Sequence, residues 1–407
     1  MISAPIRRNA VLLAAGLVCF SAMFQLVVAL ATVTLVAVTG VEGVLGLAPA
    51  IFLVAGALAV FPAGRLGDRV GRMPVIRGGF VLGILAAGAT GLGCKIDSPF
   101  FVGLGFALAG GAGAIVLLSR AAAAEMFPPE QRARGMSFVL FGAASGAIWG
   151  PLVFGPMFSG RDLTSDGLVV PWLASGLFMI AGLALSFGVR PDPKTIGATY
   201  RTGTDAPREA APIGAILRRP GVPTAMVGAV ASFAVMVGVM NLSGFVAVDR
   251  GHEHGDVFTI ISAHIVGMYG LVIVVGDLVD RIGRRRSLVG GLLIMSVANL
   301  VLAASSSLGG MSLALFLLGL GWSLSYVAAT TELVSLAAPS ERGRLVGFSD
   351  LVSSLTGAAL ALSGGVLVSA DGPVPLGLVA AALAAGPALW IAAGRGAPAA
   401  PALQAAE

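Results

Sequence analysis

The stretches GRLGDRVGRMPVI, from Gly64 to Ile76, and GDLVDRIGRRRSL, from Gly276 to Leu288, carry the same polar phrase, Gly-x-x-x-Asp-Arg-x-Gly-Arg. Each copy separates two long apolar runs, although charged residues make up only 11% of the chain. An ordinary soluble domain has about 25% charged residues. The composition therefore indicates a membrane protein, and the repeated phrase indicates that the same connection occurs twice in it.

Apolar runs of about 20 residues recur along the whole chain, and each is long enough to cross a hydrocarbon core of about 30 Å as a helix. Closed barrels need short alternating segments, which the sequence lacks. The first run follows Arg7 and Arg8 like a secretory signal, but it is too long for one, so we interpret it as a retained first helix. The twelve predicted spans are residues 10–36, 44–63, 73–93, 100–126, 135–158, 168–188, 222–248, 256–276, 288–305, 309–336, 344–369 and 373–394.

The basic residues predict how the chain is oriented. Of its 25 Lys and Arg residues, 20 fall in segments that the twelve spans place on the same side as both termini, Arg77 and Arg120 fall within spans, and only Lys95, Arg161 and Arg250 fall on the other side. Connections rich in Lys and Arg stay in the cytoplasm. We therefore expect cytoplasmic termini in a bacterial inner membrane. No basic and aromatic platform indicates a nucleic-acid partner.

The sequence divides into two similar halves around its longest polar connection, residues 189–221. In each half the quoted phrase joins the second and third spans, and an Arg-x-Arg stretch ending at Arg134 or Arg344 joins the fourth and fifth. Many transporters are built from such weak repeats, which move about a site near the membrane midplane. We therefore expect a bundle over residues 1–188, a cytoplasmic linker over 189–221, and a second bundle with a short tail over 222–407.

The paired placement of this phrase resembles the major facilitator superfamily, and the resemblance covers essentially the whole chain. Within the superfamily, the chain resembles the bacterial members of the drug/proton antiporter type. The resemblance implies an all-α membrane protein with twelve transmembrane helices in two pseudo-symmetric six-helix bundles. It also implies a secondary transporter that works by alternating access.

By resemblance, the repeated phrase is a conformational latch on the cytoplasmic face. Its glycines let helix ends approach closely, and its aspartate suits the positive N-terminus of a neighbouring helix. Its arginines bind carboxylates, and we expect Glu125 as a partner of the first copy. Topology anchoring by positive charge alone is the other interpretation. The expected latch residues are Gly64, Asp68, Arg69, Gly71, Arg72 and Glu125, with Asp280, Arg281, Gly283, Arg284 and Asp350.

The fifth span contains the run GAASGAIWGPLVFGP, with Gly146, Gly150, Pro151 and Gly155. This run resembles the antiporter motif of the superfamily, in which prolines bend the helix. Close packing through small residues is the alternative interpretation. The chain departs from drug-proton exporters in two places: Gly105 and its neighbour stand where their fourth-helix arginine would be, and the first span has no acidic residue.

Ionisable groups inside spans are costly and are therefore candidates for functional sites. Arg120 and Glu332 each lie roughly 10–14 Å inward from the cytoplasmic end of their span, at about 1.5 Å per residue. Our hypothesis is that these two residues form an ion pair between the halves, which closes the cytoplasmic side when the protein opens outward. The alternative is that each side chain pairs within its own half.

Other polar residues in the spans are candidates for coupling or substrate binding. His264 is a candidate for proton coupling because imidazole titrates near neutral pH, although a buried histidine bonded to a carbonyl is an equal alternative. His252 and His254 lie in an outer loop, where exposed polar composition is favoured over a metal site, and we predict no metal. The remaining candidates for the cavity are Gln25, Thr32, Asn241, Trp322, Ser325 and Tyr326.

Taken together, these features predict proton-coupled efflux of small amphipathic or hydrophobic compounds by a monomer. The alternative is a proton-linked or facilitative carrier of a small polar or anionic metabolite. The sequence has no Gly-x-x-x-x-Gly-Lys-Ser/Thr loop, so energy is expected from a gradient. No catalytic constellation stands out and no cofactor is expected; a membrane-embedded enzyme and a non-transporting receptor are the alternatives from other classes.

Overall fold

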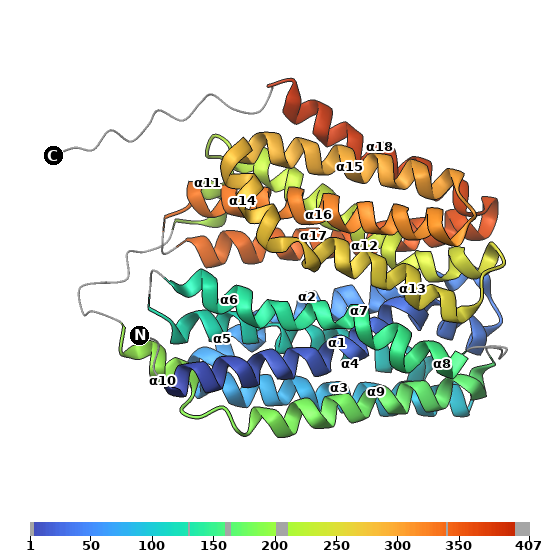
Figure 1. Cartoon of the computed structure of the whole chain (residues 1–407), viewed down its shortest axis with the longest axis horizontal. Helices are drawn as coiled ribbons and strands as arrows, with labels where there is room; N and C mark the ends of the chain where they lie inside the picture. Colours follow the sequence, from blue (N-terminus) through green and yellow to red (C-terminus); the bar gives the residue numbers. More distant parts are fainter. Residues whose placement is uncertain (1–3, 129–130, 159–163, 201–210, 339–340, 395–407) are drawn as a thin grey trace.

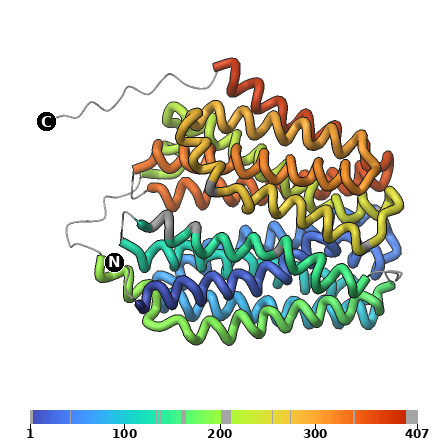
Figure 2. Tube along the Cα trace, viewed as in Figure 1, coloured from blue at the N-terminus to red at the C-terminus, as the bar shows by residue number. Residues whose placement is uncertain are grey.

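The computed structural model describes residues 4–128, 131–158, 164–200, 211–338 and 341–394. Its long helices run along one common direction, and the first residue of α1 and the last residue of α18 lie at the same end (Figure 1). We call this end the termini side and the opposite end the far side. The helices of the first and second halves form two layers that lie side by side (Figures 1 and 2).

The all-α fold with two six-helix bundles is confirmed. Within the described residues, eleven helices are long and apolar enough to cross a membrane, and a twelfth span is a pair bent by 53°. Leu117 and Leu118 divide the fourth span into two helices. The first bundle contains α1 (Ala4–Thr39), η1 (Glu42–Val44), α2 (Leu47–Val70), α3 (Arg72–Lys95), α4 (Pro99–Val116), α5 (Ser119–Met126), α6 (Arg132–Phe141), η3 (Gly142–Ser145), α7 (Gly146–Trp149), η4 (Gly150–Phe154), α8 (Gly155–Phe158) and α9 (Ser165–Ser186).

Two short helices, α10 (Pro193–Ala198) and α11 (Ile213–Leu217), follow in the linker. The second bundle then repeats the order of the first, and its second span is the bent one. It contains α12 (Val222–Asp249), α13 (His254–Ile265), η5 (Val266–Gly270), α14 (Val272–Ile282), α15 (Arg284–Ala304), α16 (Leu308–Leu336), α17 (Arg342–Asp371) and α18 (Pro373–Ala392).

The repeated phrase is almost entirely helical and so differs from the expected loop. Helix α2 continues through Val70, seven residues beyond its predicted end, and α3 begins at Arg72. Gly71 alone breaks the helix, with φ of 104°, and Gly283 does the same in the second bundle, with φ of 89°. Glycine adopts these angles without a Cβ clash, so one residue is enough to reverse the chain.

The fifth span is the least regular of the predicted helices. The run containing Pro151 forms a short turn with the wider π spacing, η4, instead of a continuous α-helix. Proline has no N–H to donate, so the regular α-helical hydrogen-bond pattern is interrupted at Pro151. A second π turn, η5, lies in the eighth span, where the bend of 53° follows.

Three contacts join the two bundles in the far half of the molecule. Phe258 of α13 stacks on Phe154 and Phe158, with ring centroids 6.1 and 5.7 Å apart. Thr32 donates a hydrogen bond to the backbone oxygen of Asn241 at 3.0 Å. Gly46 lies so close to α17 that an added Cβ would be 2.0 Å from the Ala361 oxygen. The bundles are therefore packed directly against each other on the far side.

Candidate functional site

A carboxylate of the second bundle lies about 12 Å from the termini-side end of its helix, at about 1.5 Å per residue. This is Asp350 of α17, which is half-buried and accepts a hydrogen bond from the Tyr326 hydroxyl at 2.6 Å. From the sequence, Asp350 was predicted to belong to the latch. The structure pairs it with a tyrosine of α16, and Asp68 pairs with Arg72.

A positive charge from the first bundle faces this carboxylate. Arg120 is the second residue of α5, just after the break between α4 and α5. Its side chain is half-buried. It interacts electrostatically with Asp350, Tyr326 and Tyr269, all of which belong to the second bundle. The two bundles thus contribute opposite charges to one place.

Four aromatic side chains line this place on the second bundle; we call them the aromatic wall. Trp322 and Tyr326 are stacked, with ring centroids 5.1 Å apart and an interplanar angle of 14°. Phe233 lies 6.1 Å from Tyr326, and Tyr269 meets Trp322 edge-on at 6.1 Å. The indole N–H of Trp322 is buried and has no hydrogen-bond partner among the described residues.

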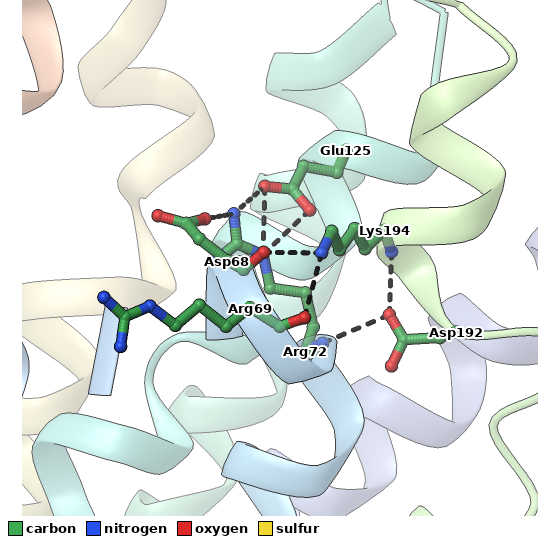
Figure 3. Close-up of polar contacts among 6 residues, drawn as sticks. All are labelled: Asp68, Arg69, Arg72, Glu125, Asp192 and Lys194. Carbon is green, nitrogen blue, oxygen red and sulfur yellow. Dashed lines mark hydrogen bonds and ion pairs between the residues drawn. The ribbon is translucent and has the colours of Figure 1, made fainter. Parts of the chain in front are cut away.

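The first clasp consists of Asp68, Arg72 and Glu125 (Figure 3). Arg72 Nε donates to both oxygens of Glu125, at 3.1 and 2.9 Å, and the Arg72 guanidinium also bonds Glu125 through Nη2. The Asp68 carboxylate lies 2.9 Å from the same guanidinium. The predicted contact between Arg72 and Glu125 is therefore present.

The linker covers the first clasp. Asp192 accepts hydrogen bonds from the backbone N–H groups of Arg72 at 3.1 Å and Met73 at 2.9 Å, so its carboxylate caps the N-terminus of α3. Lys194 donates to the backbone oxygen of Asp68 (Figure 3). An acidic side chain at a helix N-terminus is stabilised both by the free N–H groups and by the helix dipole.

The second clasp consists of Arg284, Glu332 and Ser335. Arg284 lies 3.1 Å from the Glu332 carboxylate and donates to the Ser335 hydroxyl at 2.6 Å. Glu332 is therefore paired within its own bundle, and the hypothesised ion pair with Arg120 is not the one formed in this conformation. The duplication could have predicted this pair, because Arg284 occupies the position in the second half that Arg72 occupies in the first. Each of these arginines binds a glutamate from the fourth span of its own half.

The second part of the linker is attached to the second bundle through Glu341. This carboxylate is bound by Arg219, with a shortest distance of 2.6 Å, and it accepts from the backbone N–H groups of Ala338 at 3.1 Å and Ala211 at 3.3 Å. The hydrogen bond from Arg219 is the largest cause that lowers the pKa of Glu341, to about 2. The linker is thus attached at both ends through a carboxylate. At one end its own Asp192 binds the first bundle, and at the other end Glu341 of the second bundle binds Ala211 and Arg219 of the linker.

Sequence comparison assigns the chain to a family. The sequence model described as Major Facilitator Superfamily matches residues 11–361 and 253–406. The chain belongs to this superfamily. It is 30% identical over 339 residues to the MFS-type transporter YddS of Bacillus subtilis, covering 81% of this chain and 78% of that protein. It is 27% identical over 326 residues to the riboflavin transporter RfnT of Brucella anthropi, covering 78% of each protein.

Solved structures of other proteins have the same fold as this chain. A partially occluded inward-open structure of the xylose transporter XylE from Escherichia coli matches with a TM-score of 0.74 and 15% sequence identity. The match covers 96% of this chain and 98% of XylE. The chain is therefore a multi-pass membrane transporter built on the fold of the superfamily.

Several predicted polar residues have packing roles in this superfamily member. Ser325 is buried and shares a hydrogen bond of 2.7 Å with Ser232 between α16 and α12. Thr32 and Asn241 belong to the far-side contact between the bundles. Gln25 is completely buried, and both polar atoms of its amide have no partner among the described residues.

The glycines of the fifth span allow close packing on α1. A Cβ added to Gly150 would lie 2.5 Å from the Gln25 amide nitrogen. Pro151 follows in η4, Gly146 begins α7 and Gly155 begins α8. This is the geometry that the small-residue interpretation expects, and an antiporter role for the run stays a prediction.

The histidines occupy two different environments. His264 is fully buried, and its Nδ1 lies 2.8 Å from the Leu315 oxygen, while Nε2 has no partner among the described residues. His252 Nε2 lies 2.6 Å from the Ser306 oxygen. The side chain of His254 lies outside the described part of the structure, and within that part no group of three possible metal ligands comes together.

The remaining latch residues lie at the surface of the helices. Arg69 and Arg281 are exposed at the ends of α2 and α14, and an added Cβ would meet nothing within 4 Å at Gly64. Sequence reasoning missed Phe233 and Tyr269 of the aromatic wall. The low number of tyrosines could have pointed to Tyr269, since the chain has only 3 tyrosines and two of them, Tyr269 and Tyr326, belong to the aromatic wall.

Proposed function

We propose that this chain exports small amphipathic compounds with a flat aromatic part, in exchange for protons. The observation that carries the proposal is the electrostatic interaction of Arg120 from one bundle with Asp350 and Tyr326 of the other, where Tyr326 donates to Asp350 and stacks on Trp322. A flat apolar group would stack on Trp322 and Tyr326, whose ring faces favour offset stacking. A polar group of the same ligand would contact Arg120 or the indole N–H.

We assign Asp350 as the residue that binds and releases the proton exchanged for the substrate. It faces two groups that respond to its charge, the Tyr326 hydroxyl at 2.6 Å and the guanidinium of Arg120. A protonated Asp350 would lose its attraction to Arg120 and so loosen one electrostatic link between the bundles. Because a carboxylate within a membrane span is costly, its retention there favours a functional role.

The proposal also includes an orientation and a conformation. The excess of Lys and Arg on the termini side favours a cytoplasmic location for both termini, in the inner membrane of a bacterium. The bundles pack together on the far side through Phe258 and Thr32, which favours access to the site from the cytoplasm in this conformation. We further propose that the protein works as a monomer. Residues 1–188 and 222–407 would then move as two rigid bodies, joined by the linker of residues 189–221.

A carrier for a polar or anionic heteroaromatic metabolite is the second candidate. Arg120 would attract an anionic group, and the relative RfnT is described as a riboflavin transporter. A flavin also has the flat ring that the aromatic wall suits. The two candidates therefore differ in the polarity of the ligand.

Flux measurements in liposomes test both candidates. The purified protein would be reconstituted with an imposed pH gradient, and transport of a fluorescent planar lipophilic amine would be compared with that of riboflavin. We expect gradient-dependent movement of the amine in wild type and at least a roughly ten-fold loss in Asp350→Asn and Trp322→Ala, about 1.4 kcal/mol or more of transport barrier.

Matched variants control for loss of charge and of aromatic surface. Asp371→Asn removes an exposed carboxylate from the same helix as Asp350, and Trp390→Ala removes a tryptophan from the outer helix α18. Both should transport like wild type. Movement of riboflavin but not of the amine would replace the first candidate by the second, and unchanged flux in Asp350→Asn would remove the assigned proton site.

A further inference from the structure

A cavity of about 610 Å³ opens at the termini side of the second bundle, separate from the aromatic wall. It lies between α12, α14, α15, α16 and α18. Three successive arginines line it, together with two acidic residues and a set of buried apolar side chains. These residues are Arg284, Arg285, Arg286, Asp280 and Glu332, with Ala225, Leu288 and Ala328 among the apolar ones.

The charges around the cavity leave an excess of positive charge. Arg284 and Glu332 neutralise each other in the second clasp. Arg285 donates hydrogen bonds to the backbone oxygens of Ile391 at 2.7 Å and Ala392 at 3.4 Å, and it keeps its charge. Arg286 is exposed, and no partner for it is found among the described residues. Asp280 is the only remaining acidic lining residue, so two arginines face one carboxylate.

The corresponding place in the first bundle already holds an anion. There the carboxylate of Asp192 accepts from the first N–H groups of α3, those of Arg72 and Met73. It sits so close that a Cβ on Gly71 would lie 2.9 Å from its Oδ2. The backbone break of the second bundle repeats this geometry at Gly283, with φ of 89° against 104°.

The second bundle has the same backbone without the built-in carboxylate. An added Cβ at Gly283 would meet nothing within 4 Å, and no side-chain acceptor is described for the N–H groups of Arg284 and Arg285. Where the first copy continues with Met73 and Pro74, the second continues with Arg285 and Arg286. The second copy thus has more positive charge and more room where the first copy binds an anion.

We propose that this cavity binds a phosphate group, namely the headgroup of an anionic lipid at the membrane surface. Arg285 and Arg286 would form charge-assisted hydrogen bonds to the phosphate oxygens, and the first N–H groups of α15 would add to them. The apolar lining would contact the glycerol and the first methylene groups of the chains. Basic pockets between helices at the cytoplasmic surface suit such headgroups. Free phosphate has the same chemistry, so the test separates the two sources.

Lipid binding can be measured without any knowledge of the transported substrate. The full chain would be placed in a zwitterionic phosphatidylcholine environment and titrated with phosphatidylglycerol, with bound lipid counted by native mass spectrometry and Tm followed in parallel. We expect one tightly retained phosphatidylglycerol and a rise in Tm. Arg286→Gln should weaken this binding about five-fold, which corresponds to about 1 kcal/mol per basic residue.

Further variants keep the result interpretable. Arg285→Gln/Arg286→Gln should lose the retained lipid, whereas Asp280→Asn should bind it more tightly because a repelling charge is gone. Arg7→Gln removes an exposed arginine from the same side of the molecule and should bind like wild type. Equal weakening in Arg7→Gln, or equal retention of phosphatidylglycerol and phosphatidylcholine by wild type, would overturn the proposal.

Inorganic phosphate identifies the source of the ligand. If phosphate raises Tm at millimolar concentration and the rise disappears in Arg286→Gln, the site is an anion site that free phosphate also fills. If only phosphatidylglycerol acts, the lipid chains are part of the recognition. Both results support the cavity as a phosphate site, and absence of both effects in wild type contradicts it.

Discussion

The first and second clasps use the same residue types in repeated positions, but they differ in what surrounds them. In the first clasp Arg72 and Glu125 are only 17% and 29% exposed, and the linker lies over them. In the second, Arg284 and Glu332 are 41% and 37% exposed, and a cavity opens beside them. The duplicated phrase thus determines that a pair forms, whereas the neighbouring chain determines how strongly it is held.

The glycine breaks give the largest expected losses of stability in both clasps. Alanine at Gly71 or Gly283 would adopt a backbone region that is almost restricted to glycine, which costs about 1–3 kcal/mol. At Gly71 the new Cβ would also lie 2.9 Å from Asp192 Oδ2, whereas at Gly283 it meets nothing. We expect Gly71→Ala to lower the free energy of unfolding by about 3 kcal/mol and Gly283→Ala by about 2 kcal/mol.

Equilibrium unfolding of the purified protein by sodium dodecyl sulfate measures both values. Gly78→Ala is the control, since an added Cβ there meets nothing within 4 Å and the position lies inside α3. A larger loss for Gly283→Ala than for Gly71→Ala would show that the linker does not tighten the first clasp.

Removal of one carboxylate charge from each clasp should have a moderate effect. Glu125→Gln weakens several charge-assisted bonds to a largely buried arginine, and we expect a loss of about 2 kcal/mol. Glu332→Gln weakens a half-exposed pair, and we expect less than about 1 kcal/mol. The same unfolding measurement compares them, and the double variant should be additive because the clasps share no partner. Equal losses would argue against a difference in burial as the cause.

The linker cap should contribute less than the clasp itself. Asp192→Asn keeps an acceptor at the N-terminus of α3 but removes the charge that the helix dipole stabilises. We expect a loss of about 1 kcal/mol, with Arg72 and Glu125 still paired. Thermal unfolding measures the loss, and Asp97→Asn serves as a control on the far side of the first bundle. A loss as large as that of Glu125→Gln would place the linker among the main supports of the clasp.

The second linker anchor should stabilise the protein at neutral pH and lose this contribution in acid. Glu341 has its pKa lowered to about 2 from an ordinary value of 4.5, so it contributes stability above pH 4.5 and loses it as the pH falls toward 2. The Tm difference between wild type and Glu341→Gln should therefore shrink between pH 4.5 and pH 2. A difference that stays constant over this range would exclude titration of Glu341 as its source.

The helical class, the positions of the spans and the pairing of Arg72 with Glu125 were predicted correctly from the sequence. The end of α2 was predicted wrongly, because a polar phrase can continue a helix beyond the hydrocarbon core. Glu332 pairs here with Arg284 of a neighbouring helix, as the alternative interpretation of pairing within one half expects, and an ion pair with Arg120 in an outward-open state stays a prediction. Asp350 was assigned to the latch because its depth along the helix was known and its facing direction was not.

Hydropathy and charge are summed along the chain, so the sequence by itself determined that this is a membrane protein, where its helices cross and that its two halves repeat. Only the tertiary structure decided that Arg120 interacts electrostatically with Asp350 and Tyr326, and that Asp192 caps one helix N-terminus while the other lies at a cavity. The physical reason is that these helices are apolar nearly all round, so no periodicity shows which side of each helix faces its neighbour. Packing between distant segments settles that choice.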